Sequence, residues 1–215
     1  MIFAIILMSV TVFTGVITLL DYIYFKKRRL KKAKEPFLIE YSKSFFPILL
    51  VVFVIRSFIV EPFKIPSGSM MPTLISGDFI AVNKFAYGIR LPVWNKTLIS
   101  LGSPSRGDVF VFHYPKKPSI DYIKRVVGLP GDEIKYIDKG LVVNGKPIEL
   151  KFKGKYKYET NDGQIMSALE FEELLVDPTH SILTQDRPSE NYQFNVPEGH
   201  YLAMGDNRDN ASDSR

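Results

Sequence analysis

The sequence contains no cysteine and only three histidines among its 215 residues. The absence of cysteine excludes disulfides, cysteine nucleophiles and thiolate metal sites. The histidines (His113, His180 and His200) are scattered and lack the spacing of metal ligands, so we expect ordinary strand or loop residues there. The sequence also has no internal repeat and no low-complexity linker.

Acidic residues are missing from residues 26–34, which carry seven of the lysines and arginines. The whole chain has a formal net charge of +5, so removing these seven charges leaves about −2 for all other residues. The basic character is therefore one local cluster and not a broad positive surface. This pattern argues against a nucleic-acid partner.

Two long apolar runs lie on either side of the basic cluster. Residues 1–20 contain no charge and as a helix would be about 30 Å long, the thickness of the hydrocarbon core. A cleavable signal peptide would carry positive charge before the apolar run, and here it follows. Residues 44–60 are shorter and contain Arg56, so a buried core helix is the alternative. Because Arg56 lies near the far end and can reach the interface, we favour a second membrane span.

The position of the basic cluster predicts the orientation in the membrane. By the positive-inside rule, residues 21–43 form a basic cytoplasmic loop and the N-terminus faces outward. The second span then returns the chain to the outer side. We therefore expect residues 61–215 to form one extracytoplasmic domain close to membrane lipid.

The region beyond residue 79 reads as short strands separated by turn residues, which predicts a mainly β domain. Asp138-Lys139-Gly140 is a hairpin signal and Asn144-Gly145 is a further turn. Residues 150–195 are less patterned, and 167–175 are compatible with a short helix. The expected strands cover residues 79–82, 108–112, 122–127, 134–137 and 141–143.

Residues 61–74, Glu-Pro-Phe-Lys-Ile-Pro-Ser-Gly-Ser-Met-Met-Pro-Thr-Leu, follow directly after the second apolar run. Proline fixes φ and biases the preceding residue toward extended conformations, while Gly68 adds backbone freedom. The stretch is therefore expected to present Ser67 and Ser69 on a stiff, extended loop. A polar linker that merely leaves a helix is the alternative.

Lys124 lies inside the expected strand 122–127. Alternation along a strand places it on the face shared by Tyr122 and Val126. If that face packs inward, desolvation lowers the pKa of the amine from about 10.4 toward 7–8, where it can accept a proton from a serine. An exposed strand lysine is the alternative.

Taken together, these stretches resemble the bacterial type I signal peptidases, also called leader peptidases, which use a serine–lysine dyad. The matching blocks follow the family order and span most of the chain. They are Pro-Ser-Gly-Ser-Met-Met-Pro-Thr-Leu (66–74), Gly-Asp-Phe-Ile (77–80), Arg-Gly-Asp-Val (106–109), Tyr-Ile-Lys-Arg-Val-Val-Gly-Leu-Pro-Gly-Asp (122–132) and Gly-Asp-Asn-Arg-Asp-Asn (205–210).

The resemblance implies a fold and a set of roles. Two N-terminal transmembrane helices would precede a periplasmic β-domain of the signal-peptidase type, with residues 150–195 as a variable β-subdomain. Ser69 would attack the scissile carbonyl and Lys124 would take its proton, while the Ser69 N–H and the Ser67 hydroxyl would form the oxyanion hole. Shallow apolar substrate pockets would be lined by Ile65, Pro66, Met70, Leu74, Tyr122 and Ile123. Structural support would come from Arg125, Asp206 and Asp213, with Arg125 paired to Asp213.

The same resemblance implies the partners and the location. The protein would be a monomer in the bacterial inner membrane that cuts secretory preproteins after Ala-X-Ala-like sites. It would need no metal and no organic cofactor. Residues 205–215 are rich in Asp and Asn, but they lack the carboxylate and glycine spacing of a Ca²⁺ loop.

The chain departs from the family pattern at its C-terminal end. Ala211 stands where the family has a serine whose hydroxyl helps to orient the catalytic amine, and Ser212 follows it. Ser212 would have to substitute from a shifted position, or packing alone would hold the lysine. The chain stops at Arg215 inside a block that continues in the family, so we expect a C-terminally incomplete sequence.

Three other functions are compatible with parts of the sequence. A Ser-His-Asp hydrolase would need a histidine near Ser69, and the Gly-X-Ser-X-Gly elbow is absent because Ser67 holds the position two before Ser69. Self-cleaving repressors use the same dyad but lack two membrane spans. A non-enzymatic, membrane-anchored β-domain acting as an envelope scaffold or partner-binding protein is the alternative from a different class.

Overall fold

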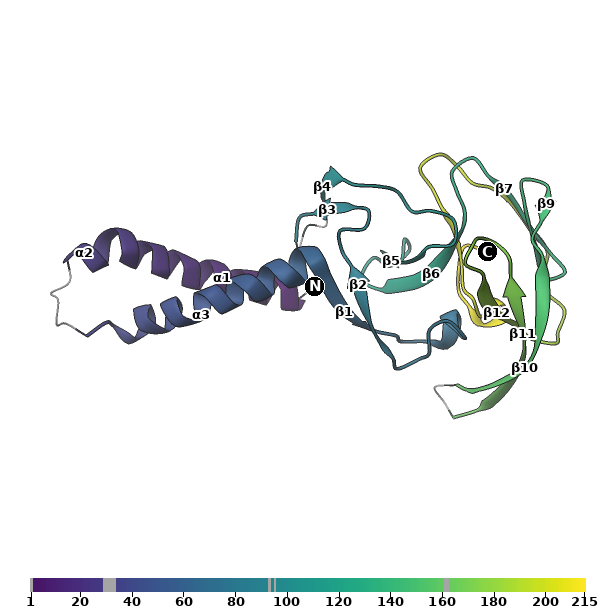
Figure 1. The fold of residues 1–215 in the computed structure, drawn as a ribbon, viewed down its shortest axis with the longest axis horizontal. Coiled ribbons are helices and arrows are strands. Elements are labelled where there is room, and N and C mark those ends of the chain that lie inside the picture. Colours follow the sequence, from purple (N-terminus) through teal and green to yellow (C-terminus); the bar gives the residue numbers. More distant parts are fainter. Residues whose placement is uncertain (1, 29–33, 93, 95, 161–162) are drawn as a thin grey trace. The chain divides into compact units, whose positions relative to one another are not determined.

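The computed structural model describes residues 2–28, 34–92, 94, 96–160 and 163–215. Within these residues the chain is helical near the N-terminus and forms strands beyond residue 60 (Figure 1). Arg29, Lys31 and Lys32 of the expected basic cluster lie outside the described residues. Two compact units can be distinguished, Met1–Pro62 with Ala81–Ser103, and Phe63–Ile80 with Pro104–Arg215.

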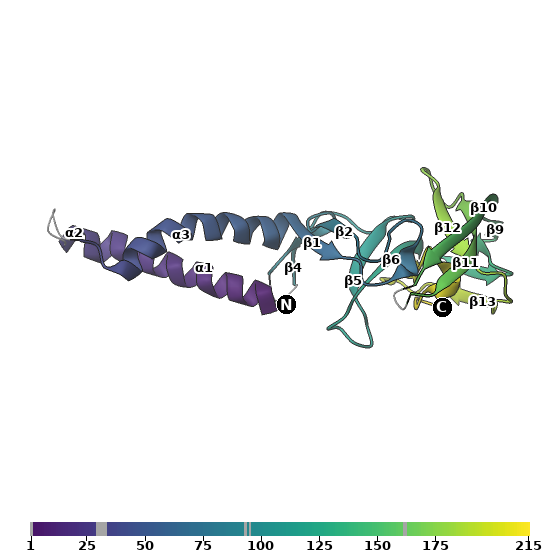
Figure 2. The same ribbon diagram turned by 90° about the horizontal axis from the view of Figure 1, so that it is seen from below.

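The first unit contains two long apolar helices that run side by side (Figures 1 and 2). Helix α1 (Ile2–Leu20) continues through a π-helical turn (Asp21–Phe25) into α2 (Lys26–Arg28). Helix α3 (Phe37–Val54) likewise ends in a π-helical turn (Ile55–Ile59). Phe3–Phe25 and Phe37–Ile59 have 23 residues each and mean hydropathies of 2.4 and 1.9, so both are long and apolar enough to cross a membrane.

The contacts between α1 and α3 explain how the two helices pack. A side chain at Gly15 would place its Cβ 2.7 Å from the ring of Phe46, so glycine permits the close approach. Near the α3 start, Lys43 pairs with Asp21 at 2.6 Å. At the far end, the Arg56 guanidinium lies 4.1 Å from the ring centroid of Phe3. The second helix begins at Phe37, seven residues before the apolar run that starts at residue 44, because its first two turns include polar residues.

Four short strands follow α3. β1 (Val60–Lys64) pairs with β2 (Phe79–Asn83), and the division between the two units passes through both strands. β3 (Gly88–Arg90) pairs with β4 (Thr97–Ser100) in the antiparallel sense, within the first unit.

The second unit contains three antiparallel sheets (Figure 1). The first sheet has the order β14-β6-β5, the second β13-β7-β8-β9 and the third β10-β11-β12. Their strands are β5 (Val109–His113), β6 (Asp121–Gly128), β7 (Glu133–Ile137), β8 (Gly140–Val143), β9 (Lys146–Pro147), β10 (Leu150–Glu159), β11 (Ile165–Glu173), β12 (His180–Thr184), β13 (Tyr192–Asn195) and β14 (Leu202–Met204). The prediction of a mainly β domain after two apolar helices is confirmed.

Strand β6 is the centre of its sheet, and every residue from Ile123 to Gly128 is buried. Val127 contributes to an apolar core shared with Ile134, Tyr136 and Leu141. Ile123 belongs to a second cluster, described below. Burial on both faces of β6 means that a polar side chain on this strand has little access to water.

The turn predictions can be compared with the structure directly. Asp138 and Lys139 have φ of 47° and 66° in the β7–β8 hairpin, and Asn144 has φ of 50° between β8 and β9, so both predicted turns are confirmed. The short helix expected over residues 167–175 is wrong, because Ile165–Glu173 forms β11. This strand pairs on both sides, with β10 and β12, and such pairing overrides the helix propensity of Ala, Leu and Glu.

Candidate active site

Ser69 lies in a short 3₁₀ turn, Gly68–Met70, that follows strand β1. Two backbone hydrogen bonds hold the segment before this turn. The Ile65 N–H donates to Asp78 O at 2.8 Å, and the Ile65 carbonyl accepts from the Gly77 N–H at 2.9 Å. Met70 is almost fully buried and packs with Ile65 and Ile123. Burial of the Met70 side chain thus holds the turn in place, and the neighbouring Ser69 lines the adjoining cavity.

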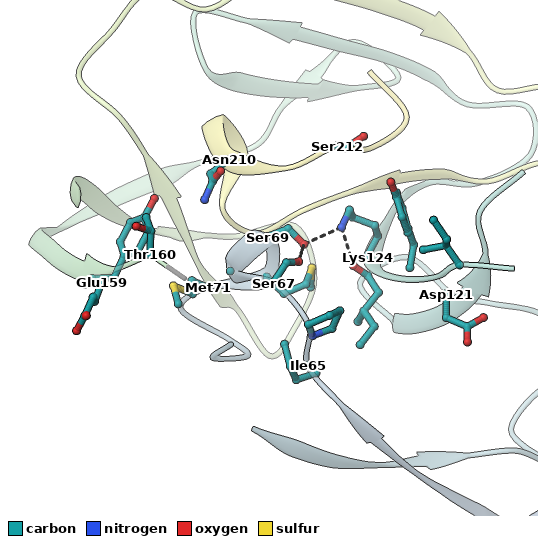
Figure 3. Close-up of a pocket in the computed structure, with 17 residues that line it drawn as sticks. Ile65, Ser67, Ser69, Met71, Asp121, Lys124, Glu159, Thr160, Asn210 and Ser212 are labelled. Carbon is teal, nitrogen blue, oxygen red and sulfur yellow. Dashed lines mark hydrogen bonds between the residues drawn. The ribbon is translucent and has the colours of Figure 1, made fainter. Parts of the chain in front are cut away.

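Lys124 approaches Ser69 from strand β6. Its Nζ lies 2.8 Å from Ser69 Oγ and also donates to Ile123 O at 2.9 Å (Figure 3). The side chain is only 4% exposed, and its amine lies 5.2 Å from the ring centroid of Tyr122. Ser67 Oγ lies 3.3 Å from Ser69 Oγ on the other side. The structure therefore brings together the three polar groups that the sequence predicted.

Burial is the main influence on the charge of Lys124. Desolvation lowers the pKa of this amine from its ordinary value, while the negative charges of Asp213 and Asp206 act in the opposite direction. Because desolvation prevails, the neutral amine is more accessible at neutral pH than in a surface lysine. A neutral amine 2.8 Å from a hydroxyl is placed to accept its proton.

A cavity of about 560 Å³ opens beside the serine–lysine pair (Figure 3). Of the predicted substrate-binding residues, five line it: Ile65, Pro66, Met70, Tyr122 and Ile123. Leu74 is not among the lining residues, and packs against the Ile65–Met70–Ile123 cluster instead. The same cavity is also lined by residues that sequence reasoning missed, namely Met71, Ile120, Asp121, Tyr158, Glu159, Thr160 and Asn210.

Three of the missed residues come from one segment. Tyr158, Glu159 and Thr160 lie at the end of β10, in the region that carried no recognisable pattern. Figure 3 shows Glu159 and Asp121 on opposite sides of Ser69. The sequence could not predict that the end of β10 lines this cavity, because the position of β10 depends on its pairing with β11.

Arg125 follows Lys124 on β6 and makes a buried ion pair with Asp206. Its Nε and Nη2 donate to the two carboxylate oxygens at 2.9 and 2.7 Å, and its Nη1 donates to Gly107 O at 2.7 Å. The prediction that Arg125 pairs with Asp213 is wrong, because its partner is Asp206. β14 pairs with β6 so that Met204 lies opposite Arg125, which brings Asp206, two residues further on, within reach.

Asp213 has different partners from those expected. Its carboxylate accepts from the Gly205 N–H at 3.0 Å and from Arg215 at 2.7 Å. Ser212 lines the cavity, but the acceptors of the Lys124 amine among the described residues are Ser69 and Ile123. Ala211 lies tight against Gly205, where any added Cβ would come within 2.4 Å of the Ala211 Cβ.

A second buried ion pair lies next to the first. Arg208 donates two hydrogen bonds to Glu173 at 2.7 and 2.6 Å, and both side chains are almost completely buried. Burial alone would raise the pKa of Glu173, but the charge of Arg208 and the neighbouring His180 outweigh it and hold that pKa at about 2. The sequence pattern identifies residues 205–210 as one block, but it does not show that Glu173 pairs with Arg208 of this block.

The histidines have other positions. His180 Nε2 lies 3.1 Å from Glu173, His113 Nδ1 lies 2.6 Å from Asp121, and His200 is exposed. Lys124 therefore occupies the position that a histidine base would need in a Ser-His-Asp hydrolase. In the described part of the chain, no group of three or more His, Asp or Glu side chains is arranged to hold a metal ion.

Comparison with known proteins is consistent with this geometry. Residues 38–215 match the family model described as signal peptidase, peptidase S26. Signal peptidase I of Pseudomonas fluorescens is 47% identical, over 99% of this chain and 81% of the relative. Signal peptidase I of Pseudomonas aeruginosa is 53% identical, over 86% of this chain and 65% of the relative. Signal peptidase I of Buchnera aphidicola from Acyrthosiphon pisum is 42% identical, over 89% of this chain and 74% of the relative.

The family match covers most of the chain and includes every residue of the serine–lysine site. The family predicted from the sequence blocks is confirmed, and so is the class of enzyme, a serine peptidase. The chain belongs to the signal peptidase family, peptidase S26.

Proposed function

We propose that this protein is a membrane-bound signal peptidase that removes signal peptides from secretory preproteins. The observation that carries the proposal is the 2.8 Å approach of a buried lysine amine to the Ser69 hydroxyl. Burial lowers the pKa of that amine, so a base is available without a histidine. The names of the relatives supply the substrate class.

In the proposed mechanism Ser69 Oγ attacks the scissile carbonyl while Lys124 Nζ takes the hydroxyl proton. The carbonyl oxygen becomes negative in the tetrahedral intermediate and accepts hydrogen bonds from the Ser69 N–H and the Ser67 hydroxyl. Lys124, now an ammonium, returns the proton to the leaving amine, and an ester to Ser69 remains. Lys124 then activates a water that hydrolyses this ester.

The apolar residues beside Ser69 support a preference for small side chains. Ile65, Pro66, Met70 and Ile123 contribute apolar surface to the lining of the cavity. The preference for Ala follows from the family resemblance, and the branched apolar side chains of Ile65 and Ile123 beside Ser69 are compatible with a small aliphatic group there. We propose cleavage after Ala-X-Ala-like sites on this basis.

The arrangement in the membrane is also part of the proposal. Phe3–Phe25 and Phe37–Ile59 would both span the inner membrane, with the basic segment between them in the cytoplasm. The β-domain that carries Ser69 would then lie on the periplasmic side, against lipid, and the enzyme would act as a monomer. External protease added to spheroplasts should digest the β-domain and spare the basic segment.

The experiment that tests the proposed activity is preprotein cleavage by the detergent-solubilised protein. We expect the wild type to yield a shortened product, and Ser69→Ala and Lys124→Ala to yield none while keeping the wild-type circular dichroism spectrum. Lys124→Arg should also be inactive, because arginine cannot deprotonate in a protein. The control is His200→Ala, an exposed histidine that should leave cleavage unchanged. An active Ser69→Ala or Lys124→Ala enzyme would refute the proposed roles.

A further inference from the structure

The turn that carries Ser69 is tied to the C-terminal segment through one residue, Asn207. The Asn207 side-chain Nδ2 donates to Gly68 O at 3.1 Å, and its backbone N–H donates to Ser69 O at 3.1 Å. Asn207 is fully buried. Its amide orientation follows from this contact, since the reverse orientation would place two carbonyl oxygens against each other.

We propose that Asn207 is a positioning residue that directs the Ser69 N–H toward the oxyanion. The Gly68 carbonyl and the Ser69 N–H belong to the same peptide unit. Because a trans peptide is planar, its C=O and N–H point in opposite directions. A hydrogen bond that holds the Gly68 oxygen on one side therefore fixes the direction of the Ser69 N–H on the other. This inference rests on the proposed peptidase function of Ser69.

The peptide unit needs such a restraint because Gly68 precedes it. Glycine lacks a Cβ, so the Gly68–Ser69 peptide can rotate at low steric cost. Within the turn, the Met71 N–H also donates to Gly68 O, at 3.2 Å. That bond joins two parts of the same short turn and moves with it. The bond from Asn207 anchors the turn to a different part of the fold.

Asn207 itself is held from both sides along the chain. The preceding residue, Asp206, forms the ion pair with Arg125, and the following residue, Arg208, forms the one with Glu173. The Leu183 N–H of β12 also donates to Asp206 O at 2.9 Å. Two buried, charge-assisted pairs thus make this segment a rigid support for the nucleophile turn.

Fold stability alone gives little reason for asparagine at this position. Its Oδ1 is buried and has no hydrogen-bond partner among the described residues. A buried, unpaired polar atom costs about 1–3 kcal/mol. The second side-chain atom, Nδ2, makes the contact with Gly68 described above. A positioning role explains why asparagine, despite the cost of burying its unpaired Oδ1, lies at position 207 beside the Gly68–Ser69 peptide.

The test compares Asn207→Ala and Asn207→Leu with the wild type in the preprotein assay. Leucine keeps the branching of asparagine and fills the same space, so a folded enzyme without the amide can be measured. We expect kcat to fall about 10–100-fold, less than the 10²–10³-fold loss for removing a donor outright, because the N–H is misdirected and not deleted. KM and the pH midpoint of the rate should remain those of the wild type. Asn144→Ala is the control, since it removes an amide bond to Asp132 in a distant turn.

A peptide aldehyde labelled with carbon-13 at its carbonyl separates positioning from general damage. Ser69 adds to this probe to form a hemiacetal whose oxygen occupies the oxyanion position. In both Asn207 variants we expect the hemiacetal to form but its oxygen to ionise at higher pH than in the wild type. Ionisation at the wild-type pH, or a kcat within twofold of the wild type, would overturn the role of Asn207. A wild type that neither cleaves preprotein nor forms the hemiacetal would instead overturn the proposed function, and the inference with it.

Discussion

Asp206→Asn tests two roles of one carboxylate, its ion pair with Arg125 and its effect on the pKa of Lys124. The change keeps the shape of the side chain but removes the charge that pairs with Arg125 at 2.7 and 2.9 Å. Thr73 Oγ1 also donates to this carboxylate, at 2.5 Å. Arg125 and Asp206 are both buried, so water cannot replace the lost partner. The variant leaves Arg125 as an uncompensated buried charge.

The size of the stability loss follows from this burial. Breaking a buried ion pair by neutralising one partner costs about 3–5 kcal/mol. In a domain of this size each kcal/mol lowers Tm by about 2–4 °C, so a decrease of about 10 °C is expected. The substitution also affects the pKa of Lys124, because the negative charge of Asp206 raises the pKa of that amine. Without this charge the pKa should fall further, and the rise of kcat with pH should move to lower pH.

Two measurements check these consequences on the same protein. Thermal unfolding followed by circular dichroism gives the change in Tm, and kcat between pH 6 and 10 gives the midpoint of the rate. Asp213→Asn is the matched comparison, since Asp213 also raises the pKa of Lys124 but pairs with Arg215. An unchanged Tm would refute the ion pair. A shift of the rate profile to higher pH in Asp206→Asn would refute the electrostatic account of Lys124.

Two further predictions concern the same support. The pKa of Glu173 is held at about 2, below its ordinary 4.5, so its contribution is fully present above pH 4.5 and is lost as the pH falls toward 2. The wild type should therefore lose about 3 kcal/mol of unfolding free energy across this range, and Glu173→Gln, already destabilised, should lose less. Gly205→Ala would place a Cβ 2.6 Å from Ser69 O and should reduce kcat about 100-fold by displacing the turn. Wild-type kcat in that variant would contradict the close packing of residues 205–207 on Ser69.

The elements that the sequence predicts best are those whose signals are local. Two apolar runs predict the two helices, and turn residues such as Asn144 and Gly145 predict the hairpin ends, because backbone preferences at these positions depend on few neighbours. Ser69 and Lys124 lie in motif blocks that follow the family order, and these blocks predict both residues. Their burial and mutual distance came from the structure.

The predictions that failed depend on long-range pairing. Residues 165–173 contain good helix formers, yet they form the central strand β11 because partners are available on both sides. The sequence suggests Asp213 as the partner of Arg125, but the strand register brings Asp206 to it instead. The sequence does not predict a role for Glu173, because no residue pattern near position 173 indicates an ion pair with Arg208. A one-residue change in register would alter each of these contacts, and register is not readable from a single sequence.

The two members of the serine–lysine pair lie on parts of the fold with unequal resistance to local opening. Lys124 is on β6, which is hydrogen-bonded to strands on both sides and buried along most of its length, so its amide should exchange hydrogen only on global unfolding. Ser69 is in a single 3₁₀ turn that a few bonds from Asn207 and Met71 hold in place. Such a turn can open at a lower free energy than the sheet. On warming, Ser69 should therefore lose its alignment before Lys124 does, and activity should disappear at a temperature where the sheets are still intact.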